Sequence, residues 1–258
     1  MPHLIFDTST NSNYITCEMT TKRILVSDPI SEKGVDAINA HPDLTADFKT
    51  GLSPEELISI IGEYDGLVVR SQTKVTREVL EAATKLQVIG RAGVGVDNID
   101  REASTDHGVI VMNTPTGNTI STAELAFTLM LSASRNIALA HQGVIAGDFK
   151  AARKAYAGIE IFGKRLAIIG MGRIGVEFAK RAQAFGMQVA AYDPFLTQAR
   201  ADSLKIELCE SPDLALTGAD FVTLHVPLTP DTKHILNEER LALMNKGAIV
   251  VNCARGGL

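Results

Sequence analysis

The chain has 258 residues, 45% of them hydrophobic, which is typical of a soluble globular protein with two domains. Its 25 Lys and Arg residues are outnumbered by 30 Asp and Glu residues, giving a net charge of -5. With no basic cluster in the sequence, this balance argues against a nucleic-acid or membrane partner and favours a small molecule. The three cysteines (Cys17, Cys209 and Cys253) are odd in number and lack metal-binding spacing, so we expect no disulfide, no metal site and a cytoplasmic location.

The first 18 residues are predicted to be a polar leader. Residues 1–21 contain no Lys or Arg and no continuous apolar core, so they match neither a secretory signal nor a transit peptide. Met19 directly precedes "TTKRILVSD", in which the first regular strand is expected. Two interpretations stay open here: translation starts at Met19, or the leader is a short ordered arm.

Strands and helices alternate through the first half of the chain, which predicts a parallel sheet with helical crossovers. The expected strands are 23–28, 66–70, 86–93 and 108–115, and the expected helices are 31–40, 53–64 and 76–84. Ser53 and Glu56 form a capping-box pattern at the start of the second of these helices. Ligands of open α/β sheets gather at the carboxyl ends of strands, so the segments 70–73 and 90–95 are candidate binding loops.

Pro115 and Gly117 interrupt the pattern and place a domain boundary near residue 117. A long helical stretch is expected from about Thr119 to Gly147. It is apolar on most of its faces, and this apolar surface is larger than the core of one domain should need. It is expected either to pack against a second subunit or to lie between the two domains of its own chain. Its most apolar part, "AELAFTLMLSAS", is shorter than the roughly 20 residues that span a bilayer.

The segment "GKRLAIIGMGRIGVEFAKRAQAFGMQVAAYDP" is the most informative part of the sequence. Gly170, Gly172 and Gly175 follow a strand and open a helix, and the next strand ends in Asp193, which is the order of a dinucleotide-binding unit. The three glycines allow a tight turn, backbone approach to a pyrophosphate and close packing of helix on strand. A carboxylate at Asp193 accepts hydrogen bonds from a ribose diol and repels a 2'-phosphate, which favours NAD over NADP.

Two further strands, "DFVTLHV" and "AIVVNC", are expected after this unit, and "KIELC" is an uncertain fifth. His225 lies near the end of "DFVTLHV", and Arg255 follows the end of "AIVVNC". The planar fork of an arginine in such a position can grip a carboxylate and polarise a neighbouring oxygen during hydride transfer. Arg255 is therefore the candidate catalytic residue.

Taken together, six motifs resemble those of the NAD-dependent D-2-hydroxyacid dehydrogenases. They are "VVRSQTKVTREVL", "GRAGVGVDNID", "VMNTPTGNTISTAEL", "IIGMGRIGVEFAKRAQAFGMQVAAYDP", "LHVPLTPDT" and "VNCARGG". The resemblance extends over residues 22–258. It implies an α/β protein with two doubly wound parallel-sheet domains: a flavodoxin-like substrate domain at 19–117, without its C-terminal return segment, and a Rossmann NAD-binding domain at 118–258, incomplete at the C-terminus.

By this resemblance, Arg255 matches the family's catalytic arginine. The implied substrate-binding residues are Arg70, Ser71, Gly93 and Val94, the last two through their backbone N–H groups. The implied NAD-binding residues are Thr73, Gly170, Gly172, Arg173, Ile174, Gly175, Asp193, Val226, Cys253 and Ala254. We interpret Cys253 as a small apolar filler rather than a reactive thiol.

Within the family, the motifs are most similar to members that oxidise 3-phosphoglycerate to 3-phosphohydroxypyruvate, the first step of serine biosynthesis. Alternatives are a dehydrogenase or reductase for another D-2-hydroxy acid and its 2-oxo acid, such as glyoxylate or hydroxypyruvate, or an NAD-binding module without catalysis. The family's paired Glu and His, which transfer a proton, have no match in this sequence, and His225 is not expected to replace them. We therefore expect a fragment of a longer enzyme that works as a homo-oligomer.

Overall fold

The computed structural model describes residues 21–258, so the predicted leader and both interpretations of Met19 lie outside the described residues. The chain divides into two compact units, with the division between Gly117 and Asn118. We call the described residues before this point unit 1 and those after it unit 2. Each unit is described by itself.

Unit 1 is built on a five-stranded parallel sheet with the strand order β2-β1-β3-β4-β5. This order is the flavodoxin-like arrangement that the sequence predicted. The strands are β1 (Lys22–Val26), β2 (Leu44–Phe48), β3 (Gly66–Val69), β4 (Val88–Arg91) and β5 (Ile110–Asn113). The helices are α1 (Glu32–Asn39), α2 (Pro54–Ile61), α3 (Arg77–Ala82) and α4 (Arg101–Asp106).

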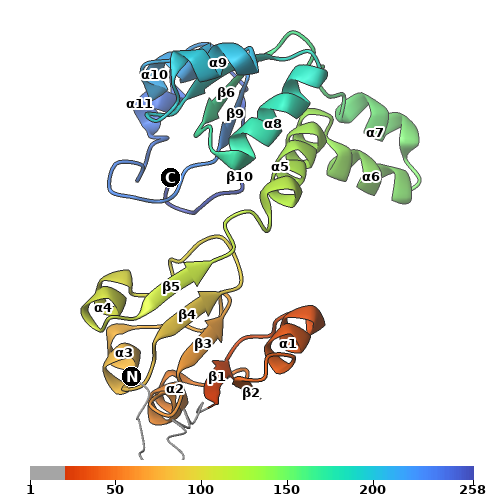
Figure 1. The fold of residues 1–258 in the computed structure, drawn as a ribbon. Coiled ribbons are helices and arrows are strands. Elements are labelled where there is room, and N and C mark those ends of the chain that lie inside the picture. The colour runs from red at the N-terminus through yellow and green to blue at the C-terminus, as the bar shows by residue number, and fades with distance from the viewer. Residues whose placement is uncertain (1–20) are drawn as a thin grey trace, which may run out of the picture. The chain divides into compact units, whose positions relative to one another are not determined.

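The core of unit 1 lies on the face of the sheet that α2, α3 and α4 cover, whereas α1 lies on the other face (Figure 1). Leu57 of α2 and Leu80 of α3 pack there against Leu67 and Ile89 of the sheet. The capping box of α2 is confirmed, because Ser53 and the third residue of the helix exchange side-chain and backbone hydrogen bonds. Ser31 precedes α1 in an extended conformation, as expected, but its side chain makes no capping hydrogen bond.

Unit 2 contains a second five-stranded parallel sheet, with the order β10-β9-β6-β7-β8. This matches five consecutive positions of the Rossmann order 3-2-1-4-5-6. The strands are β6 (Arg165–Ile169), β7 (Gln188–Tyr192), β8 (Glu207–Leu208), β9 (Phe221–Leu224) and β10 (Ile249–Asn252). The short β8 pairs with β7, which confirms the uncertain strand in "KIELC".

Helices cover both faces of the unit 2 sheet (Figure 1). The helices of unit 2 are α5 (Thr119–Ser134), α6 (Ile137–Ile145), α7 (Phe149–Ala155), α8 (Arg173–Ala184), α9 (Gln198–Leu204), α10 (Pro212–Leu216) and α11 (Glu238–Leu241). Of these, α6 and α7 pack on each other and project away from the sheet (Figure 1). On one face α5 meets α8, and the rings of Phe127 and Phe178 pack edge to face with centroids 5.5 Å apart. On the other face Ala215 and Leu216 of α10 join a separate buried cluster.

The prediction of one long helix from Thr119 to Gly147 is wrong, because the structure has two helices in this segment. The helical stretch is broken after α5, because Asn136 adopts a left-handed conformation with φ of 49°, and α6 starts in a new direction. Asn tolerates this conformation better than most residues, so its identity was the available signal. Within residues 21–258, no helix has the length and apolar character needed to cross a membrane.

Candidate active site

The glycine-rich loop of unit 2 connects β6 to α8. Gly170 has a φ of 97°, and a Cβ there would lie 2.7 Å from the backbone oxygen of His225. A Cβ on Gly175 would lie 2.1 Å from the carbonyl oxygen of Gly170. A Cβ on Gly172 would have nothing within 4 Å, so this backbone borders open space. Gly170 and Gly175 are thus required by the protein's own packing, while Gly172 leaves room for a ligand.

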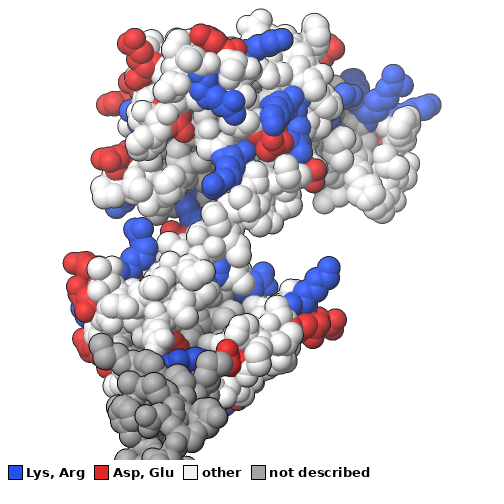
Figure 2. Space-filling view, viewed as in Figure 1, with Lys and Arg blue, Asp and Glu red and all other residues white. Residues whose placement is uncertain are grey.

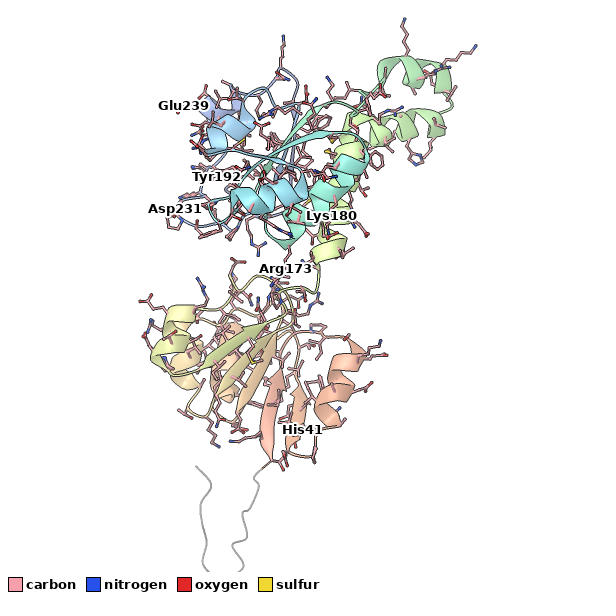
Figure 3. The ribbon with its side chains drawn as sticks, turned by 45° about the horizontal axis from the view of Figure 1, so that its top comes forward. His41, Arg173, Lys180, Tyr192, Asp231 and Glu239 are labelled. Carbon is pink, nitrogen blue, oxygen red and sulfur yellow. The ribbon has the colours of Figure 1, made fainter. Side chains whose placement is uncertain are left out.

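The first turn of α8 supplies the positive end of this site. The first backbone N–H groups of a helix have no intrahelical partners. Gly172, the N-cap of α8, has no side chain that could accept hydrogen bonds from them. Such groups bind phosphate, aided by the helix dipole. Arg173, the first residue of α8, is exposed (Figure 3), and Ile174 is half-buried. The loop and this turn therefore fit a dinucleotide diphosphate.

Asp193 directly follows β7 and is fixed beside the same loop. One carboxylate oxygen accepts a hydrogen bond from the N–H of Met171 at 2.8 Å, and the other accepts one from the N–H of Phe195 at 2.8 Å. A carboxylate has about four acceptor positions. The half-buried Asp193 therefore has capacity left for the two hydroxyls of a ribose.

The end of β9 lies against the glycine loop. A methyl of Val226 lies 2.7 Å from where a Cβ on Gly170 would be. The His225 ring packs 5.4 Å from the Phe178 ring, and its Nε2 lies 3.1 Å from the hydroxyl of Thr223. Burial lowers the pKa of His225 to about 4, so the imidazole is neutral near pH 7 and a weak base.

The end of β10 carries Arg255 on a turn that Asn252 organises. The Asn252 side chain accepts from the N–H of Ala254 at 3.0 Å and donates to the carbonyl oxygen of Arg255 at 2.8 Å. Arg255 itself is exposed, and Nη1 donates to the carbonyl of Ala254 at 2.8 Å. Burial raises the pKa of the half-buried Cys253 thiol, which disfavours a reactive thiolate. Asn252 was not among the residues predicted from the sequence, although Asn after a strand is a turn signal.

In unit 1, Arg70, Ser71 and Thr73 form the loop that follows β3. Their backbone is held by Asp28, a residue that was not predicted from the sequence. Asp28 follows β1 and is only 1% exposed, and its carboxylate accepts hydrogen bonds from the loop, including one from the Arg70 N–H at 2.6 Å. The Asn98 side chain contacts the same loop from its carbonyl side.

The loop after β4 is closed by its own backbone. The Gly93 N–H donates to the carbonyl of Arg91 at 2.8 Å, and the Asn113 side chain donates to the carbonyl of Val94 at 2.6 Å. A carboxylate bound at Gly93 would therefore have to share this N–H. The Arg91 guanidinium lies directly over Gly93, because a Cβ there would be 1.7 Å from Nη1.

A pocket of about 810 Å³ opens beside these two loops, within unit 1. Its lining includes Ser31 at the start of α1, together with Arg70, Arg91, Asn113 and Thr114. Nε of Arg91 is buried and has no hydrogen-bond partner among the described residues. Two guanidinium groups and an unsatisfied N–H donor make this pocket suited to an anion.

The predicted site residues fall into two groups, one in each unit. Unit 1 holds Arg70, Ser71, Thr73, Gly93 and Val94, and unit 2 holds the glycine loop, Asp193, Val226 and the residues after β10. No group of three potential metal-ligating side chains occurs in the described part of the chain. On the faces drawn in Figure 2, acidic and basic side chains are interspersed over each unit.

A Rossmann strand order, an open glycine loop and a strand-end carboxylate define a dinucleotide-binding protein of the dehydrogenase type. Residues 127–258 match the family described as D-isomer specific 2-hydroxyacid dehydrogenase, NAD binding domain. The chain therefore belongs to the D-isomer specific 2-hydroxyacid dehydrogenases, and its second unit contains the family's NAD-binding domain.

Curated and solved relatives agree with this assignment. The chain is 51% identical over 236 residues to a D-3-phosphoglycerate dehydrogenase of Methanocaldococcus jannaschii, covering 92% of this chain and 44% of that protein. A solved structure from Thermus thermophilus matches with a TM-score of 0.82 at 35% identity, covering 91% of this chain and 74% of that one. A D-lactate dehydrogenase from Aquifex aeolicus, solved with NAD and lactic acid, matches with a TM-score of 0.81 at 28% identity, covering 91% and 69%. The chain thus spans under half the length of the curated relative.

Proposed function

We propose that these residues belong to an NAD-dependent dehydrogenase that oxidises 3-phosphoglycerate to 3-phosphohydroxypyruvate, the first step of serine biosynthesis. Unit 1 is the substrate domain (19–117), and unit 2 is the NAD-binding domain (118–258). The observation that carries this proposal is the unit 1 pocket, whose lining includes both Arg70 and Arg91. The name of the Methanocaldococcus jannaschii relative supports the same substrate.

NAD binding is assigned to the glycine loop and its surroundings. The open backbone at Gly172, with the first turn of α8 at Arg173 and Ile174, holds the diphosphate. The carboxylate of Asp193 accepts from the ribose hydroxyls and repels a 2'-phosphate. Val226, Cys253 and Ala254 are assigned to the wall of the NAD site, and Thr73 of unit 1 to its nicotinamide end.

When bound, NAD supplies the hydride acceptor for C2 of the substrate. Arg255 is the catalytic residue: its guanidinium binds the substrate carboxylate and polarises the neighbouring C2 oxygen. Arg70 and Ser71 bind the substrate in unit 1, and Gly93 and Val94 contribute backbone N–H groups. We assign no proton transfer to His225, because its lowered pKa makes it a poor proton acceptor near neutral pH.

The choice among the 2-hydroxy acids and 2-oxo acids of this family depends on the second anionic group. Glyoxylate and hydroxypyruvate carry one carboxylate, which one arginine can bind. 3-Phosphoglycerate carries a phosphate as well, and Arg91, which lines the same pocket as Arg70, is a second cation for it. We therefore expect Arg91→Leu to reduce turnover of 3-phosphohydroxypyruvate far more than turnover of hydroxypyruvate. Equal losses for the two substrates would argue for one of the sister activities.

The NAD site is tested by a matched pair of glycine variants in calorimetric titrations with NAD. Gly172→Ala should leave the unfolding free energy within about 0.5 kcal/mol of wild type, yet weaken NAD binding about tenfold, or about 1.4 kcal/mol. Gly175→Ala should cost about 1–3 kcal/mol of stability through overpacking. Asp193→Ala should reduce the preference for NAD over NADP. Unchanged NAD affinity in Gly172→Ala would contradict the assignment of the loop.

Catalysis is tested by NAD reduction with 3-phosphoglycerate at alkaline pH, on this chain and on the same gene read past Leu258. Turnover that disappears in Arg255→Lys, which retains the charge but not the fork, supports the proposed role. NAD binding without turnover in either product would indicate a binding module instead.

We propose further that the protein is a cytoplasmic homo-oligomer. Leu125 and Leu129 lie one turn apart on α5 and are 55% and 44% exposed, and Ile137 of α6 is 55% exposed. Apolar side chains gathered in this way favour association with a second copy. Leu125→Glu should convert the oligomer to a monomer in sedimentation velocity, whereas a wild-type monomer at all concentrations would contradict the proposal.

A further inference from the structure

The backbone of the loop after β3 forms a nest of N–H groups around a single carboxylate. Asp28 accepts hydrogen bonds from the N–H groups of Arg70 at 2.6 Å, Gln72 at 3.2 Å and Thr73 at 3.1 Å. It also accepts the hydroxyl of Thr73 at 2.7 Å. Successive backbone N–H groups that converge in this way are a common anion-binding arrangement. Here the anion is part of the protein.

The position of this nest in the sheet explains its importance. The chain runs from β1 outward to β2 on one side and returns to β3 on the other, so the strand order reverses between β1 and β3. Ligands of open α/β sheets bind in the crevice at such a reversal. Asp28 follows β1 at this reversal, is 1% exposed and is bonded to the loop after β3. Asp28 does not itself line the unit 1 pocket, whereas Arg70 of the loop does.

Asn98 fixes the opposite side of the same loop. Its Nδ2 donates to the carbonyl of Arg70 at 2.9 Å and to the carbonyl of Thr73 at 2.7 Å. Arg70 and Thr73 are thus each held through both their N–H and their C=O groups. The side chains of Arg70, Ser71 and Gln72 remain exposed on the outer side.

We propose that Asp28 is a positioning residue, a built-in anion whose carboxylate holds the backbone of residues 70–73 in the conformation that presents Arg70 and Ser71 to the substrate. Its link to the substrate rests on the function proposed above. The hold on the loop itself does not depend on that function. Because a misplacement of about 1 Å can cost about 100-fold in rate, loss of this anion should lower kcat/KM for 3-phosphoglycerate by about 100-fold.

The direct test is chemical rescue of Asp28→Ala by formate. Alanine keeps the Cβ atom of Asp28, and a formate ion bound beside it can replace the missing carboxylate. The measurement is amide hydrogen exchange of Arg70, Gln72 and Thr73 in this chain. We expect faster exchange in the variant and saturable recovery with formate, but no recovery with chloride at equal ionic strength.

A second variant covers the case in which Asp28→Ala does not fold. Asp28→Asn keeps the shape of the side chain but replaces one acceptor by a donor, so it should also speed exchange at these amides. Asp65→Asn is the matched control, since Asp65 accepts the N–H of Arg23 at 3.0 Å near the amino ends of the same strands. The control should leave exchange at residues 70–73 unchanged.

Wild-type exchange rates at Arg70, Gln72 and Thr73 in Asp28→Asn would overturn the proposal, as would the absence of formate rescue in folded Asp28→Ala. The exchange measurement needs no turnover. If wild type does not oxidise 3-phosphoglycerate but the exchange results are as expected, the proposed function fails while the role of Asp28 in holding the loop stands. If turnover is present and Asp28→Asn both speeds exchange at these amides and lowers the kcat/KM for substrate, both stand.

Discussion

The half-buried imidazole of His225 should make unit 2 lose stability when the pH falls below 6.5. Burial lowers the pKa of His225 from 6.5 to about 4. Above pH 6.5 the ring is neutral in both the folded and the unfolded chain. Between pH 6.5 and 4 the unfolded chain binds a proton that the folded chain does not, so the free energy of unfolding decreases as the pH falls. Below pH 4 both states are protonated and this loss is complete.

The size of the effect follows from the two pKa values. A fall from 6.5 to about 4 corresponds to about 3 kcal/mol of unfolding free energy. The comparison is with His225→Gln, which keeps a polar group near Thr223 but cannot titrate. Urea unfolding at pH 7.5 and 4.5 should show that wild type loses about 2–3 kcal/mol more than the variant.

A separate measurement removes any dependence on the unfolding mechanism. The ring protons of His225 should titrate in NMR spectra near pH 4, well below an ordinary histidine. Titration near 6.5, or an identical pH dependence of stability in wild type and variant, would refute the reasoning. It would also reopen the question of whether His225 can accept a proton near neutral pH.

Three further predictions concern other local interactions. Ser53→Ala removes the capping box of α2 and should cost about 1 kcal/mol in urea unfolding. Burial raises the pKa values of both the Cys209 and the Cys253 thiol, so iodoacetamide at pH 8 should alkylate each more slowly in the folded than in the unfolded chain, as measured by peptide mass spectrometry. Hydrogen bonding to Arg165 lowers the pKa of Glu207, whose side chain is 55% exposed. Glu207→Gln should therefore lower the free energy of unfolding by less than about 1 kcal/mol. The difference between wild type and this variant should shrink as the pH falls below 4.5, because the carboxylate is then protonated.

The parts of the fold that the sequence predicted are those specified by nearby residues. The turn at Gly170, the helix that begins at Arg173 and the strand that ends before Asp193 lie within one short segment, and each has its own local signal. The capping box at Ser53 is local in the same way. Local chemistry determined these elements, and the tertiary structure did not override it.

The elements that the sequence did not reveal have weak or conflicting local patterns. The strand β2 reads "LTADF", in which polar and apolar residues alternate, and it lies at the edge of its sheet, where one side needs no strand partner. The break at Asn136 interrupts an apolar run that otherwise continues from α5 into α6. At β2 the alternation was itself a strand signal, carried by only five residues, and at the break the signal was the residue type of Asn136.

Asp28 and Asn98 escaped prediction because their contacts join distant parts of the chain. Asp28 reaches a loop more than 40 positions away, and Asn98 reaches the same loop from at least 25 positions away. Strand pairing brings these segments together, so no local pattern could reveal the contact. In this fold, the candidate ligand-binding residues lie in local motifs, while the residues that hold their backbone depend on the topology.

Asp28 and Asp193 show how one local pattern supports two different roles. Each follows a parallel strand of its unit, β1 or β7, and each accepts backbone N–H groups from a neighbouring loop. Asp28 is 1% exposed and takes three N–H groups and a hydroxyl, which fill its acceptor positions. Asp193 is half-buried, with two N–H partners supplied by Met171 and Phe195. The unused acceptor capacity of Asp193 makes it the carboxylate suited to an external ligand, whereas the filled shell of Asp28 makes it part of the scaffold.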